Sequence, residues 1–182
     1  QHLRMDPENR LLAHGPRKRL SPYAIRDAAL FTSGLLVEKI GGPSVKPYMP
    51  PRIWKSISNA TYKQDKGEKL YRRSMYTYWK RSAPAPSMTI FDAPTREKCM
   101  VERARTNTPL QALVTLNDPQ FVEAARHVAQ RMMKEGGKTP KERVEFGYRL
   151  VTSRKPRPMV ARILESAFNE EFENYKKNPD DA

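Results

Sequence analysis

The sequence has a single cysteine and no long apolar run. One cysteine among 182 residues excludes an internal disulfide framework and a zinc site built from thiolates. No apolar run approaches about 18 residues, so we expect no helix that spans a membrane. The chain begins without an initiator methionine and without the apolar core of a signal peptide. We therefore expect a piece of a longer protein, whose compartment the sequence alone leaves open.

The sequence also lacks the motifs of common catalytic chemistries. Its three histidines, His2, His14 and His127, form no H-x-x-x-H pair, so we expect solvated surface histidines and no zinc site. Cys99 has no histidine close in sequence to act as its base. A C-x-x-C-H haem motif, a G-x-S-x-G motif, a phosphate-binding loop and a dinucleotide fingerprint are all absent. We therefore predict no cofactor and no metal in this chain, and we assign no catalytic residue.

What the sequence does have is positive charge, concentrated in its middle. There are 34 Lys and Arg against 20 Asp and Glu, a net charge of +14. Residues 43–105 carry fourteen basic and five acidic residues, whereas residues 1–20, 21–42 and 106–182 carry net charges of +3, 0 and +2. The middle segment also holds eight of the sixteen aromatic residues and seven of the sixteen prolines. This composition indicates a proline-interrupted, basic and aromatic surface segment.

The flanking segments have the pattern of helices. A capping side chain precedes a proline four times, a pair typical of helix starts, in Ser21-Pro22, Thr108-Pro109, Asp118-Pro119 and Thr139-Pro140. Hydrophobic periodicity then predicts helices over residues 22–40, 109–116, 119–135, 140–152 and from 158 onward. We expect Gly41-Gly42-Pro43 to end the first helix.

We therefore predict a mainly α fold. It comprises a single helical domain of about five helices, with a long proline-rich, partly extended basic segment in the middle. Its parts are an N-terminal arm, a first helix, the basic aromatic segment and a helical bundle portion, at residues 1–20, 21–42, 43–105 and 106–182. In the first helix we expect an inward stripe of Ile25, Ala28, Ala29, Thr32, Leu35, Leu36 and Ile40. In the last we expect one face of Val160, Ile163, Leu164, Ala167, Phe168 and Phe172.

Basic and aromatic residues alternate over residues 70–81, where we expect an extended or strand segment. Guanidinium groups bind sulfate or phosphate, and flat rings stack on bases or sugar faces. This pattern fits an anionic polymer as ligand, with candidate binding residues Arg72, Arg73, Tyr76, Tyr78, Trp79, Lys80, Arg81, Arg105 and Asn107. In a purely structural alternative the rings point into the core and the arginines pair with acids and helix C-termini. The sequence leaves both interpretations open.

Acidic residues in and beside this segment suggest an enzymatic alternative. Two carboxylates that meet in a cleft can act as general acid and base in glycoside cleavage, and the candidates are Asp65, Glu68, Asp92, Glu97 and Glu102. The sequence does not show that any two of them meet. Ion pairing with the many surrounding Lys and Arg residues is the competing interpretation.

Three ordered blocks of sequence resemble a known family. The first runs from Arg19-Leu20-Ser21 to Lys46-Pro47-Tyr48, the second from Leu70-Tyr71-Arg72 to Asp92-Ala93-Pro94, and the third from Arg105-Thr106-Asn107 to Asn117-Asp118-Pro119. Together they resemble the C-terminal domain of unknown function in large secreted planctomycete proteins that also carry a cytochrome-c-like domain.

The resemblance implies an exported parent protein, located in the periplasm or at the cell surface, in which any haem lies in a separate domain. It transfers no catalytic residue, because the family has no established activity. The association of such proteins with sulfatases and glycan-degrading enzymes suggests anionic polysaccharides. We therefore predict a module that docks other domains of the parent or binds an anionic glycan. The alternatives are a glycan-active enzyme domain and nonspecific binding of nucleic acid, and an exported location argues against the latter.

Overall fold

A computed structural model describes residues 5–12, 19–57 and 61–178 of the chain. These residues form seven α-helices, and they contain no strand beyond three isolated bridges. The prediction of a mainly α fold is therefore confirmed. The helices are α2 (Pro22–Ser33), α3 (Ile53–Ile57), α4 (Pro86–Ile90), α5 (Pro109–Asn117), α6 (Pro119–Glu135), α7 (Pro140–Thr152) and α8 (Pro158–Lys177). Two 3-10 turns, η1 (Gly67–Tyr71) and η2 (Ser74–Tyr76), lie between α3 and α4.

Four of the five longer helices start where the capping pairs predict, and α8 starts at the predicted Pro158 without a side-chain cap. Ser21 Oγ accepts from Ala24 N at 3.2 Å and Asp118 Oδ1 accepts from Gln120 N at 2.9 Å. Thr139 caps α7 in a reciprocal capping box with Glu142. Thr108 is the exception, because its side chain makes no capping hydrogen bond and α5 starts on its proline alone. Side-chain caps and proline at the first helical position together account for these starts.

The predicted end of the first helix is wrong. Helix α2 ends at Ser33, because Gly34 adopts the left-handed conformation with φ +77° and the amide of Leu35 turns back to Leu30 O at 2.9 Å. The chain after Gly34 is extended, so glycine terminates the helix well before Gly41. The predicted stripe is also displaced, since Ala28 and Ile40 are exposed. The buried face instead consists of Pro22, Arg26, Leu30 and Ser33.

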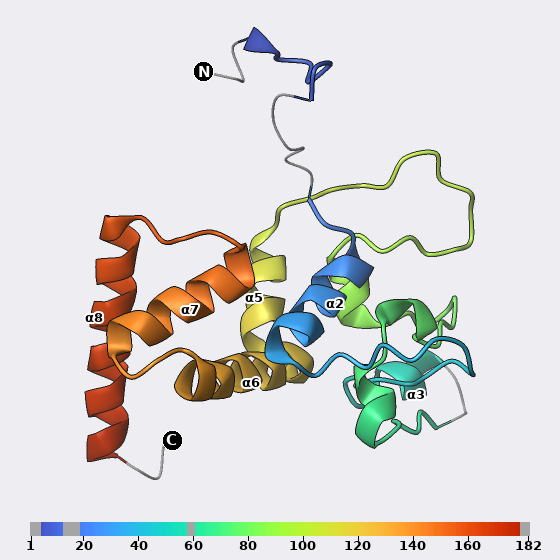
Figure 1. The fold of residues 1–182 in the computed structure, drawn as a ribbon. Coiled ribbons are helices and arrows are strands. Elements are labelled where there is room, and N and C mark those ends of the chain that lie inside the picture. The colour runs from blue at the N-terminus through green and yellow to red at the C-terminus, as the bar shows by residue number, and fades with distance from the viewer. Residues whose placement is uncertain (1–4, 13–18, 58–60, 179–182) are drawn as a thin grey trace.

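Helix α6 lies at the centre of the helical part. It packs against α2, α5 and α7, and α8 packs against α7 at the edge of the molecule (Figure 1). Because α8 packs mainly on α7 within the described residues, most of its expected inward face is exposed, as Ile163, Leu164 and Phe172 show. The rings of Phe168 and Phe172 stack on each other with centroids 6.2 Å apart. The prediction that this face is buried is therefore wrong for most of its members.

The middle segment folds on the side of α2 and α6 away from α8 (Figure 1). The segment is not extended throughout, because it contains α3, α4 and both 3-10 turns. Extended backbone appears locally, in parallel bridges that join Val37 to Arg72 and Val45 to Thr77. The strand prediction for residues 70–81 is therefore right only at isolated positions. Two small clusters of buried residues hold the segment together, Met49 with Trp54 and Ala83, and Ala85 with Met88 and Ala93.

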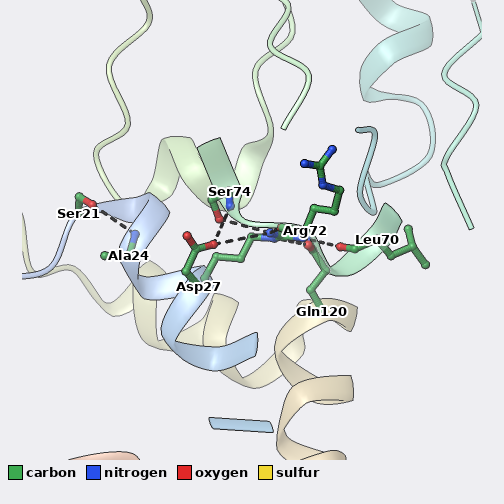
Figure 2. Close-up of polar contacts among 8 residues, drawn as sticks. Ser21, Ala24, Asp27, Leu70, Arg72, Ser74 and Gln120 are labelled. Carbon is green, nitrogen blue, oxygen red and sulfur yellow. Dashed lines mark hydrogen bonds and ion pairs between the residues drawn. The ribbon is translucent and has the colours of Figure 1, made fainter. Parts of the chain in front are cut away.

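A buried arginine joins this segment to the helices. Arg26 of α2 is 5% exposed, and its guanidinium donates to acceptors on three other elements. The acceptor residues are labelled in Figure 2. The acceptors are Leu70 O at 2.6 Å, Arg72 O at 2.9 Å, Ser74 Oγ at 3.3 Å and Gln120 Oε1 at 2.9 Å. The neighbouring Asp27 accepts from Ser74 N at 2.7 Å. Burial lowers the pKa of Arg26, and the carboxylates of Asp27 and Asp118 oppose that shift.

Candidate functional site

Three aromatic rings and two lysines form a contiguous group in the middle segment. The Trp54 ring lies 5.1 Å from Tyr62 and 6.1 Å from Tyr78, between centroids. Lys80 Nζ lies 4.6 Å from the centre of the Trp54 ring, and Lys46 Nζ lies 5.2 Å from that of Tyr78. We call these five residues the cation–ring cluster. The rings attract the ammonium groups and hold two positive charges at a defined place on the surface.

Several of the predicted binding residues lie at or beside this cluster. Tyr78 and Lys80 belong to it, Tyr78 is 39% exposed, and Arg81 follows Lys80 as an exposed residue. Arg73 is exposed as well. No contact that joins Arg73 to the cluster is found among the described residues.

Trp79 belongs to a second group of rings. It is half-buried and packs against the cluster of Ala85, Met88 and Ala93 together with Tyr23. The guanidinium of Arg96 lies over both rings, 4.5 Å from the centre of Trp79 and 5.9 Å from that of Tyr23. The structure therefore separates Trp79 from its sequence neighbours Tyr78 and Lys80.

Arg72 and Tyr76 hold the backbone of the segment. Arg72 is 5% exposed, and its guanidinium stacks on the Tyr76 ring at 3.8 Å. It donates to three carbonyl oxygens, of Lys39 at 2.8 Å, Gly41 at 2.6 Å and Pro43 at 3.2 Å. The Tyr76 hydroxyl accepts from Gly41 N at 2.8 Å. These contacts place both side chains in the support of the loop at residues 39–43.

Among the described residues, no basic side chain of the middle segment forms an ion pair. In the part of the chain that the structure describes, the ion pairs are Arg10–Glu8, Arg26–Asp27, Arg131–Glu135 and Lys176–Glu173. None of these pairs includes any of the fourteen bases of residues 43–105. The excess charge of the segment is therefore not neutralised by contact ion pairs within the described residues. Such a surface attracts polyanions through its net positive charge.

The predicted residues Arg105 and Asn107 lie near a separate cleft. Asn107 Oδ1 accepts from Arg19 at 2.9 Å, and the same arginine donates to Gln111 Oε1 at 2.5 Å. Arg105 lines a cleft of about 330 Å³ together with Arg19 and Arg103. Asn107 thus acts as an internal acceptor, whereas Arg105 is exposed beside two further guanidinium groups.

The structure brings two of the five candidate carboxylates to one cleft. Asp92 and Glu102 both line the cleft that contains Arg105. Both oxygens of Asp92 accept hydrogen bonds from Thr106, which supplies its amide at 2.7 Å and its hydroxyl at 2.8 Å. Asp65 accepts from Lys46 N at 2.7 Å. The carboxylates of Asp65 and Asp92 therefore stabilise loops by accepting hydrogen bonds from backbone amides. Glu68 and Glu97 are exposed.

The remaining sequence predictions concern the histidines, the cysteine, metal sites and membrane spans. His127 is half-buried on α6 and Cys99 is exposed, whereas His2 and His14 lie outside the described residues. Within residues 5–12, 19–57 and 61–178, no group of three or more His, Cys, Asp or Glu side chains is placed to hold a metal ion. In the same residues, every helix is too short or too polar to cross a membrane.

The sequence did not reveal Lys46, Trp54 and Tyr62 as members of the cluster. They lie within the basic aromatic segment, but no periodicity relates them to residues 78–80. Their only signal is composition, because the contacts form through long-range folding. Nothing in the sequence indicates that Gln111 is a structural residue either. Its side chain is 2% exposed, and its amide donates to Ile90 O at 2.9 Å and to Thr106 Oγ1 at 3.0 Å.

These features define a mainly α domain that presents a basic aromatic segment. The chain belongs to the PSD1 family, described as protein of unknown function (DUF1553), whose model matches residues 1–168. The predicted membership of a family of unknown function is thereby confirmed. No curated protein and no solved structure matches the chain.

Proposed function

We propose that this domain binds an anionic polysaccharide through the cation–ring cluster and the adjoining Arg81. The observation that carries the proposal is the set of fourteen basic residues that make no ion pair within the described part of the chain. Four of them lie over aromatic rings, and Lys46 and Lys80 do so within the cation–ring cluster. A polymer with repeated sulfate or carboxylate groups engages several such charges at once.

The aromatic rings support a sugar polymer in particular. The partly exposed Tyr78 offers a ring beside the ammonium group of Lys46. A pyranose ring has an apolar face that packs on an aromatic ring, and its acidic substituents pair with nearby cations. The exported location implied by the family resemblance agrees with an extracellular polysaccharide. We propose on the same ground that the parent protein is periplasmic or on the cell surface, with any haem in a separate domain.

Retention on immobilised heparin, a sulfated polysaccharide, tests the proposal. The triple variant Lys46→Ala/Lys80→Ala/Arg81→Ala removes the charges of the site, and we expect it to elute at a clearly lower salt concentration than the wild type. Its control is Lys155→Ala/Arg157→Ala/Arg162→Ala, which removes the same charge from exposed residues at and before α8. We expect the control to elute close to the wild type.

Two outcomes would contradict this function. Equal elution of the two triple variants would mean that net charge alone governs retention. Displacement of the wild type from heparin by duplex DNA at far lower concentrations than by soluble heparin would favour binding of nucleic acid, to which basic surfaces bind without sequence preference.

A second candidate function is docking to other domains of the parent protein. The observation that favours it is the exposure of large apolar side chains on α5 and α8, which are Leu110, Leu113, Leu116, Met159, Ile163, Phe172 and Tyr175. Extended apolar patches on a soluble surface commonly mark an interface. We propose that another domain of the same longer chain covers the exposed apolar side chains of α5 and α8.

Hydrogen exchange tests the docking function. We expect the amides of α5 and α8 to exchange more slowly in the full-length parent than in this domain alone, while α2 exchanges equally in both. Equal exchange of α5 and α8 in the two proteins would contradict docking. This outcome would leave the polysaccharide proposal unaffected, because Lys46, Lys80 and Arg81 belong to neither α5 nor α8.

A further inference from the structure

A groove of about 600 Å³ lies between α6 and the middle segment. Its floor includes the buried Leu30 of α2, and Tyr48 and Tyr71 line the side formed by the middle segment. This volume falls within the usual range for sites that bind small molecules. None of the nine binding residues predicted from the sequence lines it.

Polar side chains from both sides face this groove. Helix α6 contributes Glu123, Arg126 and His127, which their spacing places on one helix face. Gln64 and Asn117 add amides at the edges, and both are exposed. The lining thus combines apolar surface, hydrogen-bonding amides and charges of both signs.

The contacts of two lining residues fix their orientation. The Tyr71 hydroxyl donates to Glu123 Oε1 at 2.7 Å, and this hydrogen bond, more than burial, raises the pKa of Tyr71. Gln120 accepts from the buried Arg26 through Oε1, which fixes the orientation of its amide. Both side chains are therefore held in place before any ligand arrives, which reduces the entropy that binding costs.

The groove adjoins the cation–ring cluster. Lys46 N donates to Asp65 Oδ2 at 2.7 Å, and Asp65 N donates to Lys46 O at 2.9 Å. These two bonds pair the stretch that carries Lys46 and Tyr48 with the stretch that carries Gln64 and Asp65. Lys46 belongs to the cluster, whereas Tyr48 and Gln64 line the groove. A polymer bound at the cluster therefore lies close to the groove.

We propose that this groove is a subsite for one acidic sugar unit, a uronate or a sulfated pyranose. This inference rests on the proposed function, because the unit belongs to the same polysaccharide. The tyrosine rings and Val122 cover the apolar face of the sugar, and the amides and Glu123 bind its hydroxyls. Arg126 and His127 face its acidic group. A bare anion gains little, because Glu123 repels it and it brings no hydroxyl to donate.

Calorimetric titration of the domain with a sulfated, uronate-containing heparin disaccharide tests the subsite. Val122→Trp fills the groove, and Met133→Trp is its matched control, since the two residues lie on α6 and are 49% and 48% exposed. Only Val122 of the two lines the groove. We expect Val122→Trp to weaken disaccharide binding at least about tenfold and Met133→Trp to leave it unchanged.

A second variant and a second ligand keep the test independent of folding. Arg126→Gln changes an exposed side chain, and we expect it to weaken disaccharide binding about fivefold or more, because it removes a charged hydrogen bond. Inorganic sulfate at equal concentration should not compete. Unchanged affinity in both Val122→Trp and Arg126→Gln would overturn the subsite, as would full competition by sulfate.

The outcome for the subsite is separable from that for the proposed function. If the wild type does not bind the disaccharide but heparin retention still depends on Lys46, Lys80 and Arg81, the subsite is wrong and the proposed function stands. If heparin retention is insensitive to that triple variant, the proposed function fails, and the subsite fails with it.

Discussion

Basic residues have two different roles in this domain, and the role depends on whether the side chain is buried. Arg26 and Arg72 are each 5% exposed and donate mainly to backbone carbonyls, so their charge organises loops. Lys80 and Arg81 have no described acidic partner and lie toward the surface. Sequence alternation over residues 70–81 could not distinguish these cases, because the bridges at Arg72 and Thr77 are separated by a 3-10 turn.

At the residue scale, the clearest prediction concerns Arg26. We expect Arg26→Leu to lower the free energy of unfolding by on the order of 3 kcal/mol, because the buried carbonyls of Leu70 and Arg72 lose their donor. Urea denaturation monitored by circular dichroism measures this loss. The control is Arg162→Leu on the exposed surface of α8, which should change the stability by less than about 0.5 kcal/mol. Equal stabilities of the two variants would mean that the Arg26 network adds little.

Elements were predictable where local chemistry decides them. Each of the five longer helices starts at its predicted proline, because a cap and a proline act within one turn. Helix ends were harder to predict, since both Gly34 and Gly41 adopt a left-handed conformation that can end a helix. Helix α2 ends just before Gly34, where Arg131 of α6 donates to the nearby carbonyl of Thr32. Burial of helix faces was least predictable, because α8 has an amphipathic pattern but few neighbours within the described residues.

At the element scale, the start of α7 predicts a dependence on pH. Glu142 accepts from the amides of Lys138 and Thr139, each at 2.9 Å, and these bonds lower its pKa. Because the pKa in the folded state is below that in the unfolded state, the stabilisation is complete above the ordinary glutamate value. It is lost as the pH falls through the lower, folded-state pKa.

The measurement is the melting temperature as a function of pH, for the wild type and for Glu142→Gln. We expect the wild type to melt at the higher temperature at pH 7, and the difference to shrink as the pH falls below the ordinary pKa of a glutamate, through the lower pKa of Glu142. A difference that stays constant from neutral to strongly acidic pH would show that the charge of Glu142 does not stabilise the capping box.

At the scale of the whole molecule, the basic segment and the exposed face of the last helix lie apart. The basic middle segment folds on one side of α2 and α6, and the exposed apolar residues of α8 lie on the other (Figure 1). Composition alone predicted a basic aromatic surface within residues 43–105. It did not predict the cation–ring cluster or the groove along α6, because both depend on contacts between distant parts of the chain. The family match to residues 1–168 spans all three sequence blocks.

The central claim is that the cation–ring cluster and Arg81 bind an anionic polysaccharide by charge. The most direct test is the affinity of the domain for soluble heparin, measured by calorimetry at increasing concentrations of NaCl. Because bound cations release counterions from a polyanion, we expect a steep fall in affinity with salt for the wild type. The slope should be clearly shallower for Lys46→Ala/Lys80→Ala/Arg81→Ala than for the control triple variant at α8. Identical slopes for the two triple variants, or an affinity that does not change with salt, would contradict the account.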